Sequence, residues 1–138
     1  MLDDILLFYT MRRLFAIQQL VLFLEFSSKR GDEYLFFPPD ILEENEKIQE
    51  FYESYDAKRK ARGLITKGVA PLKLKPFFTK RTYLTMKYGN LPMPANMAFC
   101  NDKMAVISWS DKPVGVLIKS KKIVEKQKEF FMSIWNAM

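Results

Sequence analysis

The sequence predicts a single α/β domain over residues 1–138, built on a mixed sheet that is closed by a C-terminal helix. Three observations indicate this class. Short apolar runs alternate with amphipathic segments in the first half of the chain, two hairpin turns follow Asn96, and the apolar period changes from two to about 3.6 at Ser120. We therefore expect a parallel strand–helix–strand–helix–strand start followed by antiparallel hairpins.

The first strand is expected at Ile5–Thr10, because a short continuous apolar run is typical of a sheet that is covered on both faces. Arg12–Ser28 then has the spacing of an amphipathic helix, and one continuous helix over residues 2–26 is an open alternative. The expected inner stripe of the helix consists of four aliphatic residues: Leu14, Ile17, Val21 and Leu24.

A second strand, Glu33–Phe37, is expected to end at the two prolines that follow it. Asp40 can then cap a helix that runs to about Arg62, since its carboxylate can accept bonds from free backbone N–H groups. The first turns of this helix are acidic and its last turn is basic, which complements the helix dipole. Gly63 is expected to end the helix, and Leu64–Thr66 to begin a third strand.

The next segment, Lys67–Lys80, contains two prolines and alternates lysines with apolar residues. We expect it to form an extended excursion or a lid. Arg81–Tyr88 alternates as a strand does, and Gly89–Ala95 is expected to be a loop.

The last third of the chain is expected to form three short strands and one helix. Residues 101–102 and 110–113 are the expected turns, because Asn and Asp tolerate the positive φ of hairpins. The helix that begins after Ser120 is expected to cover the sheet, and a two-fold interface is the alternative. Its apolar face has six members: Ile123, Val124, Phe130, Phe131, Ile134 and Trp135.

The chain contains no histidine and one cysteine, Cys100. The absence of histidine excludes Ser-His-Asp and Cys-His catalysis, and a metal site would need carboxylates alone. No CxxC, GxGxxG or phosphate-loop pattern is present. We therefore predict a non-catalytic protein without a cofactor, located in a reducing cytoplasm, with Cys100 as a small core residue.

A membrane partner is not expected. The longest uncharged run near the N-terminus, Leu14–Leu24, has eleven residues, whereas a helix that spans a bilayer needs about 20. The acidic start, with Asp3 and Asp4, also argues against a signal peptide.

Charge is distributed unevenly along this chain of net charge +6. Residues 40–56 hold seven acidic residues, and residues 57–87 hold ten basic residues and no acidic one. This asymmetry is compatible with solvated faces, with a basic face that meets an acidic face of a second copy, or with a nucleic-acid surface. In the last case Phe77, Phe78 and Tyr83 would be placed to stack on bases.

Four segments carry a resemblance to a known family: Gly31–Phe37 (GDEYLFF), Tyr55–Leu64 (YDAKRKARGL), Asn96–Trp109 (NMAFCNDKMAVISW) and Pro113–Met138. In the second, Arg59 and Gly63 match a Y-x3-R-x3-G pattern. Together the segments resemble the C-terminal domain of TrmB-like transcriptional regulators, which is similar to a half-size phospholipase-D-like unit. The histidine-based H-x-K-x4-D motif of phospholipase D is absent, so phosphodiesterase chemistry is excluded.

The resemblance implies a non-catalytic domain that senses a small-molecule effector or pairs with itself as a homodimer, and that contacts nucleic acid only indirectly. Regulators of this family usually carry a winged helix-turn-helix before this domain, and Met1 is expected to lie almost on the first strand. A direct nucleic-acid-binding module and a purely self-associating structural domain are the alternatives.

An effector pocket is expected beyond the carboxyl ends of the parallel strands. The candidate ligand-binding residues are Thr10, Asp40, Arg59, Thr66 and Lys67. For Asp40 an ordinary helix cap is the alternative, and for Arg59 the alternative is a charge at a helix C-terminus or an ion pair with the acidic helix of a neighbour.

Overall fold

The computed structural model describes residues 5–10, 14–40, 46–94, 96–109 and 114–138, with side chains from residue 17 onward. These residues form a seven-stranded sheet in the order β1-β7-β6-β5-β2-β3-β4. The strands are β1 (Ile5–Thr10), β2 (Glu33–Phe37), β3 (Ile65–Pro71), β4 (Leu84–Gly89), β5 (Met97–Cys100), β6 (Lys103–Ser108) and β7 (Val114–Lys119).

The sheet is mixed, as the sequence predicts. Strands β2, β3 and β4 are parallel neighbours, whereas β2, β5, β6, β7 and β1 pair in antiparallel fashion. It follows from these pairings that β1 runs in the same direction as β2 and β3, so the parallel start is confirmed. The sequence did not reveal that β5, β6 and β7 lie between β1 and β2.

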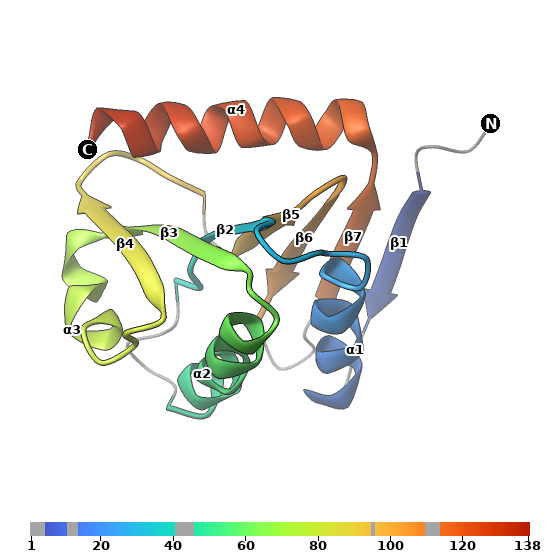
Figure 1. Ribbon diagram of the computed structural model, residues 1–138, viewed down its shortest axis with the longest axis horizontal. Helices are drawn as coiled ribbons and strands as arrows, with labels where there is room; N and C mark the ends of the chain where they lie inside the picture. Colours follow the sequence, from blue (N-terminus) through green and yellow to red (C-terminus); the bar gives the residue numbers. More distant parts are fainter. Residues whose placement is uncertain (1–4, 11–13, 41–45, 95, 110–113) are drawn as a thin grey trace.

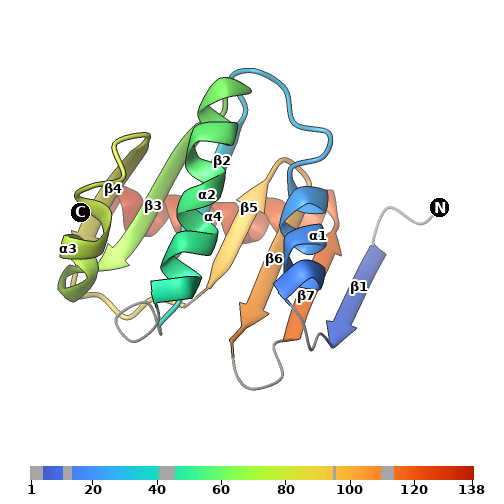
Figure 2. The ribbon, with the colours of Figure 1, turned by 90° about the horizontal axis from the view of Figure 1, so that it is seen from below.

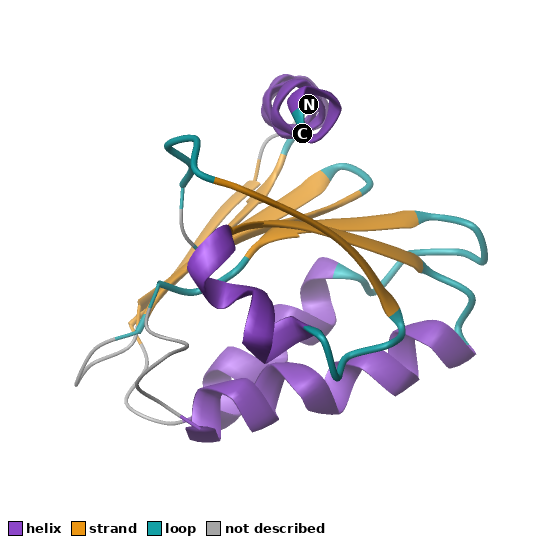
Figure 3. Cartoon of the chain, turned by 90° about the vertical axis from the view of Figure 1, so that its left-hand side faces the viewer, coloured by secondary structure: helices purple, strands orange, loops and turns teal. Residues whose placement is uncertain are grey.

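Helices cover both faces of the sheet (Figures 1 and 3). On one face lie α1 (Leu14–Leu24), α2 (Glu46–Ala61) and the short α3 (Lys75–Phe78), which follows a 3-10 turn at Leu72–Leu74. On the other face, α4 (Lys121–Ala137) is the one helix among the described residues. Figure 2 shows α1 and α2 lying along the strands, with α4 crossing behind them.

Alternation along the strands builds a separate core on each face. The core under α1 and α2 includes Tyr34 and Cys100, and the core under α4 includes Leu35 and Phe99. Cys100 is buried, as predicted, and burial raises the pKa of its thiol to about 11.

Local signals placed several element ends correctly. Gly63 has a φ of +79° and ends α2, and Asn101 has a φ of +54° in the turn between β5 and β6. Ser120 caps α4, because its Oγ accepts a hydrogen bond from the Ile123 backbone N–H at 3.2 Å. In α1, the predicted inner residues that are described (Ile17, Val21 and Leu24) are buried.

The apolar face predicted for α4 is too wide. Val124, Phe131, Ile134 and Trp135 are buried, whereas Ile123 is 44% exposed and Phe130 is 45% exposed. Residues seven apart lie on the same side of a helix, so Ile123 and Phe130 lie together at one exposed edge of the predicted face, and Val124 and Phe131 lie on the side that faces the sheet.

One open alternative and one further expectation are wrong. A continuous helix over residues 2–26 does not form, because Ile5–Thr10 pairs with β7 along its whole length. The excursion expected at Lys67–Lys80 is instead the rest of β3, the 3-10 turn and α3. Its apolar residues Ala70, Leu74 and Phe78 are buried in a third cluster, which explains why this lysine-rich segment is ordered against the sheet.

Other boundaries differ only slightly. β4 begins at Leu84 rather than at Arg81, and the loop after it is confirmed from Asn90 to Pro94. The start expected for α2 involves residues 41–45, and the second hairpin turn involves residues 110–113. Both segments lie outside the described residues.

Candidate functional site

The residues predicted from sequence do not form a single site. β3 continues to Pro71, so Thr66 and Lys67 lie in its first half and not at its carboxyl end, and the prediction that they lie there is wrong. The two are consecutive in a strand and so face opposite sides of the sheet. Thr66 is buried, and the Lys67 Nζ lies 2.7 Å from a carboxylate oxygen of Glu33.

Of the remaining predicted residues, one lines a cavity. Asp40 is exposed in a turn after Pro39, and the side chain of Thr10 lies outside the described part of the chain. Arg59 is 2% exposed and lies in the wall of a cavity between α1, α2 and the sheet. This cavity is the candidate site.

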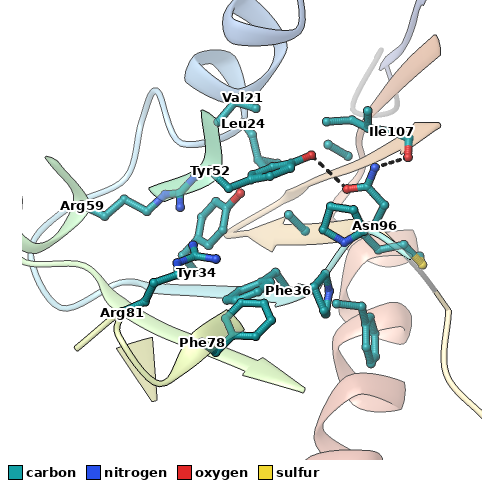
Figure 4. A pocket seen from close by; sticks show the side chains of 16 residues that line it. Val21, Leu24, Tyr34, Phe36, Tyr52, Arg59, Phe78, Arg81, Asn96 and Ile107 are labelled. Atoms are coloured by element: carbon teal, nitrogen blue, oxygen red, sulfur yellow. Dashed lines mark hydrogen bonds between the residues drawn. The ribbon is translucent and has the colours of Figure 1, made fainter. Parts of the chain in front are cut away.

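The cavity is narrow and mostly apolar, with polar groups at its two ends (Figure 4). Its volume is about 30 Å³, which is enough for about one water molecule. Figure 4 shows Arg59 and Arg81 reaching one end on either side of Tyr34, with Tyr52 and Asn96 toward the other end. The walls between them are apolar and include Val21, Leu24, Phe36, Phe78, Ala98, Ala105 and Ile107.

The spacing of residues on α2 produces the charged end of the cavity. Tyr55 and Arg59 are four residues apart and so share one face of the helix, which is the physical content of the Y-x3-R pattern. The guanidinium carbon of Arg59 lies 3.8 Å from the centre of the Tyr34 ring and 5.4 Å from that of Tyr55. Aromatic faces attract a cation of this kind, so they contribute to holding Arg59 inside the fold.

Glu25, near the end of α1, neutralises this buried arginine. Its Oε2 lies 2.7 Å from Arg59 Nε, and its Oε1 lies 2.9 Å from Arg62 Nη1. The side chains of Glu25 and Arg59 are each only 3% exposed. The partner of Arg59 is therefore a carboxylate of the same chain, contrary to the alternative of a neighbour's acidic helix.

A second ion pair joins α2 to the segment before β4. Arg81 Nε and Nη2 donate to the two carboxylate oxygens of Asp56 at 2.7 and 2.8 Å, a bidentate arrangement. Arg59 Nη2 differs from all these groups. Among the described residues it is the one buried side-chain nitrogen or oxygen without a hydrogen-bond partner.

The uncharged end of the cavity is a closed hydrogen-bond network. Trp109 Nε1 donates to Tyr52 Oη at 3.0 Å, and Tyr52 Oη donates to Asn96 Oδ1 at 3.0 Å. Asn96 Nδ2 in turn donates to the Ile107 carbonyl. Asn96 has a φ of +56°, and its backbone bonds to Pro38 and Ile107 hold it there. Burial raises the pKa of Tyr52, so this end is uncharged over a wide pH range.

Sequence reasoning missed Glu25, Asp56, Arg81 and Asn96 as parts of this site. One signal could have indicated the cavity. The face of α2 that packs on the sheet contains Tyr52, Tyr55 and Arg59, which are three and four residues apart. Purely apolar residues would normally be expected on such a face.

The burial of Tyr34 predicts a loss of stability at alkaline pH. Burial raises the pKa of its hydroxyl from 10.0 to about 12. Between these values the unfolded chain releases the proton and the folded chain retains it, so the free energy of unfolding falls as pH rises. The loss attributable to Tyr34 should reach about 2–3 kcal/mol near pH 12. Urea unfolding from pH 9 to pH 12 measures it.

The matched control is Tyr34→Phe, which keeps a ring beneath Arg59 but has no titrating hydroxyl. Its free energy of unfolding should fall less steeply than that of the wild type between pH 10 and pH 12. Parallel pH profiles for the two proteins would show that Tyr34 is not protected by the fold.

Two other classes of site are absent from the described residues. No group of three or more Cys, Asp or Glu side chains is arranged to hold a metal ion. None of the helices is both long enough and apolar enough to cross a membrane.

Comparison with known proteins identifies the fold. No family model matches the sequence, and no curated protein matches it. Among solved structures, TrmBL2, an archaeal chromatin protein whose structure shows a novel mode of DNA binding, matches with a TM-score of 0.62 at 16% identity. NucT from Helicobacter pylori matches with a TM-score of 0.60 at 10% identity.

The two alignments differ in how much of the other protein they include. Both cover 96% of this chain, but they cover 52% of TrmBL2 and 96% of NucT. The chain thus spans about half the length of TrmBL2. The expected likeness to TrmB-type proteins is confirmed at the level of the fold: this chain has an α/β fold that it shares with about half of TrmBL2 and with nearly all of NucT.

Proposed function

We propose that this chain is a non-catalytic sensor domain, related to those of TrmB-type transcriptional regulators, that binds a small effector in the cavity between α2 and the sheet. The observation that carries the proposal is a narrow apolar cavity with polar groups converging at its ends. Ligand sites in proteins commonly have this composition. The absence of histidine from the sequence supports a binding role rather than a catalytic one.

The position of α2 suggests how binding would be transmitted. Its inner face contributes Tyr52 and Arg59 to the cavity, and its outer face is exposed at Glu50, Glu53 and Lys60. A ligand that enlarges the cavity would displace α2 relative to the sheet. We propose that a regulator assembled from two copies reads this displacement, and that contact with DNA is indirect.

The similarity to TrmBL2 also supports a second candidate function, direct nucleic-acid binding, because that protein is described as a DNA-binding chromatin protein. Exposed lysines on α2 and α3, including Lys58, Lys60 and Lys75, favour this alternative. The aromatic residues expected to stack on bases support this alternative only in part. Phe78 is 3% exposed and packs on Phe36, whereas Tyr83 is 52% exposed.

The test is a thermal-unfolding screen of small metabolites against the wild type and a cavity-filling variant, Ala105→Val. Ala105 is 2% exposed and lines the cavity, so two added methyl groups should occupy the space that a ligand needs. We expect at least one metabolite to raise the melting temperature of the wild type and not that of Ala105→Val. The exposed residue Ala137 provides the matched control Ala137→Val, which should respond like the wild type.

The same preparations should be titrated with duplex DNA at two salt concentrations. Saturable DNA binding that weakens steeply with salt, with no metabolite distinguishing the wild type from Ala105→Val, would replace the sensor proposal by the nucleic-acid alternative. The absence of any saturable ligand in both assays would contradict both.

A further inference from the structure

We propose that the ligand of this cavity is a short apolar acid, whose carboxylate binds between Arg59 and Arg81 and which enters through the Asp56–Arg81 ion pair. This inference rests on the proposed sensor function and adds to it the chemical class of the effector and its route of entry. Three features of the described residues support it. They are a hydrogen-bond donor without a partner, an excess of positive charge, and an arginine that lines both the cavity and a hollow on the surface.

The first feature is the unpartnered Nη2 of Arg59. A buried N–H donor without an acceptor costs free energy, and the cost is larger for a charged group. The Arg59 side chain is 3% exposed, its Nε is bonded to Glu25, and its Nη2 has no partner. An oxygen atom supplied by a ligand in the cavity would satisfy this donor.

The second feature is the balance of charge among the ion-paired groups around this end of the cavity. The linked groups are three guanidiniums, of Arg59, Arg62 and Arg81, and two carboxylates, of Glu25 and Asp56. One positive charge is therefore left over among these five groups, and water screens part of it because Arg62 is 39% exposed and does not line the cavity. A ligand with one negative charge would balance the set, whereas a neutral or cationic ligand would not.

The third feature is the position of Arg81. It lines the inner cavity, and it also lines a hollow of about 220 Å³ on the surface, together with Glu53, Lys80 and Tyr83. Asp56 lines the same hollow. The bidentate Asp56–Arg81 pair thus stands between the surface hollow and the inner cavity. A carboxylate that arrives in the hollow can replace Asp56 as the bidentate partner of Arg81.

The rest of the cavity defines the body of the ligand. Beyond the two arginines the walls are apolar, and the hydrogen-bond groups of Tyr52 and Asn96 at the far end already bond to one another and to the Ile107 carbonyl. A second charged group on the ligand would find no partner there. Because the cavity holds about one water molecule at its volume of about 30 Å³, an apolar body can enter only if α2 moves away from the sheet, which favours a short one.

The probes are the straight-chain carboxylates from acetate to octanoate, their neutral amides, and inorganic phosphate, all at matched ionic strength. Binding is followed by the fluorescence of Trp109 in a Trp135→Phe background, because Trp109 bonds to Tyr52 and the chain has two tryptophans. Affinity for the acids should rise by about fourfold per methylene until the chain outgrows the cavity. The amides should bind about tenfold to a hundredfold more weakly.

Two variants test the role of Arg81 with opposite expected signs. Asp56→Asn removes the internal competitor for Arg81 and should tighten acid binding. The double variant Asp56→Asn with Arg81→Gln removes both charges and should weaken it. Circular dichroism of both proteins checks that they remain folded, and because Asp56→Asn is expected to gain affinity, partial unfolding cannot imitate its result.

The outcomes separate this inference from the proposal on which it rests. If the amides bind as tightly as the acids, and if Ala105→Val abolishes this binding, the ligand is not an acid but the sensor proposal still holds. If phosphate binds more tightly than every carboxylate, the conclusion that the ligand has an apolar body is wrong. An unchanged affinity in Asp56→Asn would overturn the entry route, and the absence of saturable binding by any probe would overturn the anionic ligand class.

Discussion

Replacing Glu25 with glutamine is expected to lower the free energy of unfolding by about 3–5 kcal/mol, because it removes one partner of a buried ion pair. Glu25 is 2% exposed, and its carboxylate bonds to both Arg59 and Arg62. Arg62 is 39% exposed at its side chain and can turn to water, but Arg59 is enclosed and cannot. The variant therefore retains a buried guanidinium whose counter-charge is missing.

The measurement is urea unfolding at neutral pH, followed by circular dichroism. Glu129→Gln makes the same chemical change on the surface, where Glu129 pairs with Lys126 at 3.3 Å and both side chains are more than half exposed. This control should stay within about 0.5 kcal/mol of the wild type. A result for Glu25→Gln that is equally small would mean that Arg59 does not depend on Glu25 for its charge balance.

The fold class was predictable because its signals are local. A glycine ending a helix, an Asn-Asp turn and a serine cap each depend on a few consecutive residues, and Gly63, Asn101 and Ser120 adopt these roles. Strand order is not local. β5 pairs with the free edge of β2, β6 and β7 follow it, and β1 therefore lies at the far side of the sheet. No turn or period in the sequence encodes that choice of edge.

The candidate site was less predictable, for a related reason. Glu25 and Arg59 are 34 residues apart, and Asp56 and Arg81 are 25 apart, so each ion pair exists only once the sheet is assembled. Arg59 was identified because it matches the Y-x3-R-x3-G pattern of the family that the chain resembles, but its partner could not be identified in this way. Thr66 and Lys67 were misplaced because the end of β3 was expected too early, and a strand boundary decides which residues reach an edge of the sheet.

Replacing Phe131 with alanine is expected to cost about 3–5 kcal/mol of unfolding free energy, because a large ring is removed from a fully packed core. Phe131 is 0% exposed, and its ring centre lies 5.2 Å from that of Phe37 and 6.3 Å from that of Phe99. These contacts join α4 to two neighbouring strands, β2 and β5. Loss of the ring would leave a cavity and remove contacts between α4 and the sheet. Among the described helices, α4 alone covers this face of the sheet.

The adjacent residue supplies the control. Phe130 is 45% exposed, so Phe130→Ala makes the same chemical change one position away with less buried area to lose. Urea unfolding should show a cost of about 1 kcal/mol for this variant, since only part of the ring leaves an apolar environment.

Equal costs for the two variants would mean that α4 is rotated relative to the sheet, with Phe130 as deeply buried as Phe131, or that Phe130 is covered by a second copy of the chain. Repeating the measurement over a range of protein concentrations separates these cases, because the cost at Phe130 grows with concentration only when a second copy contributes to it.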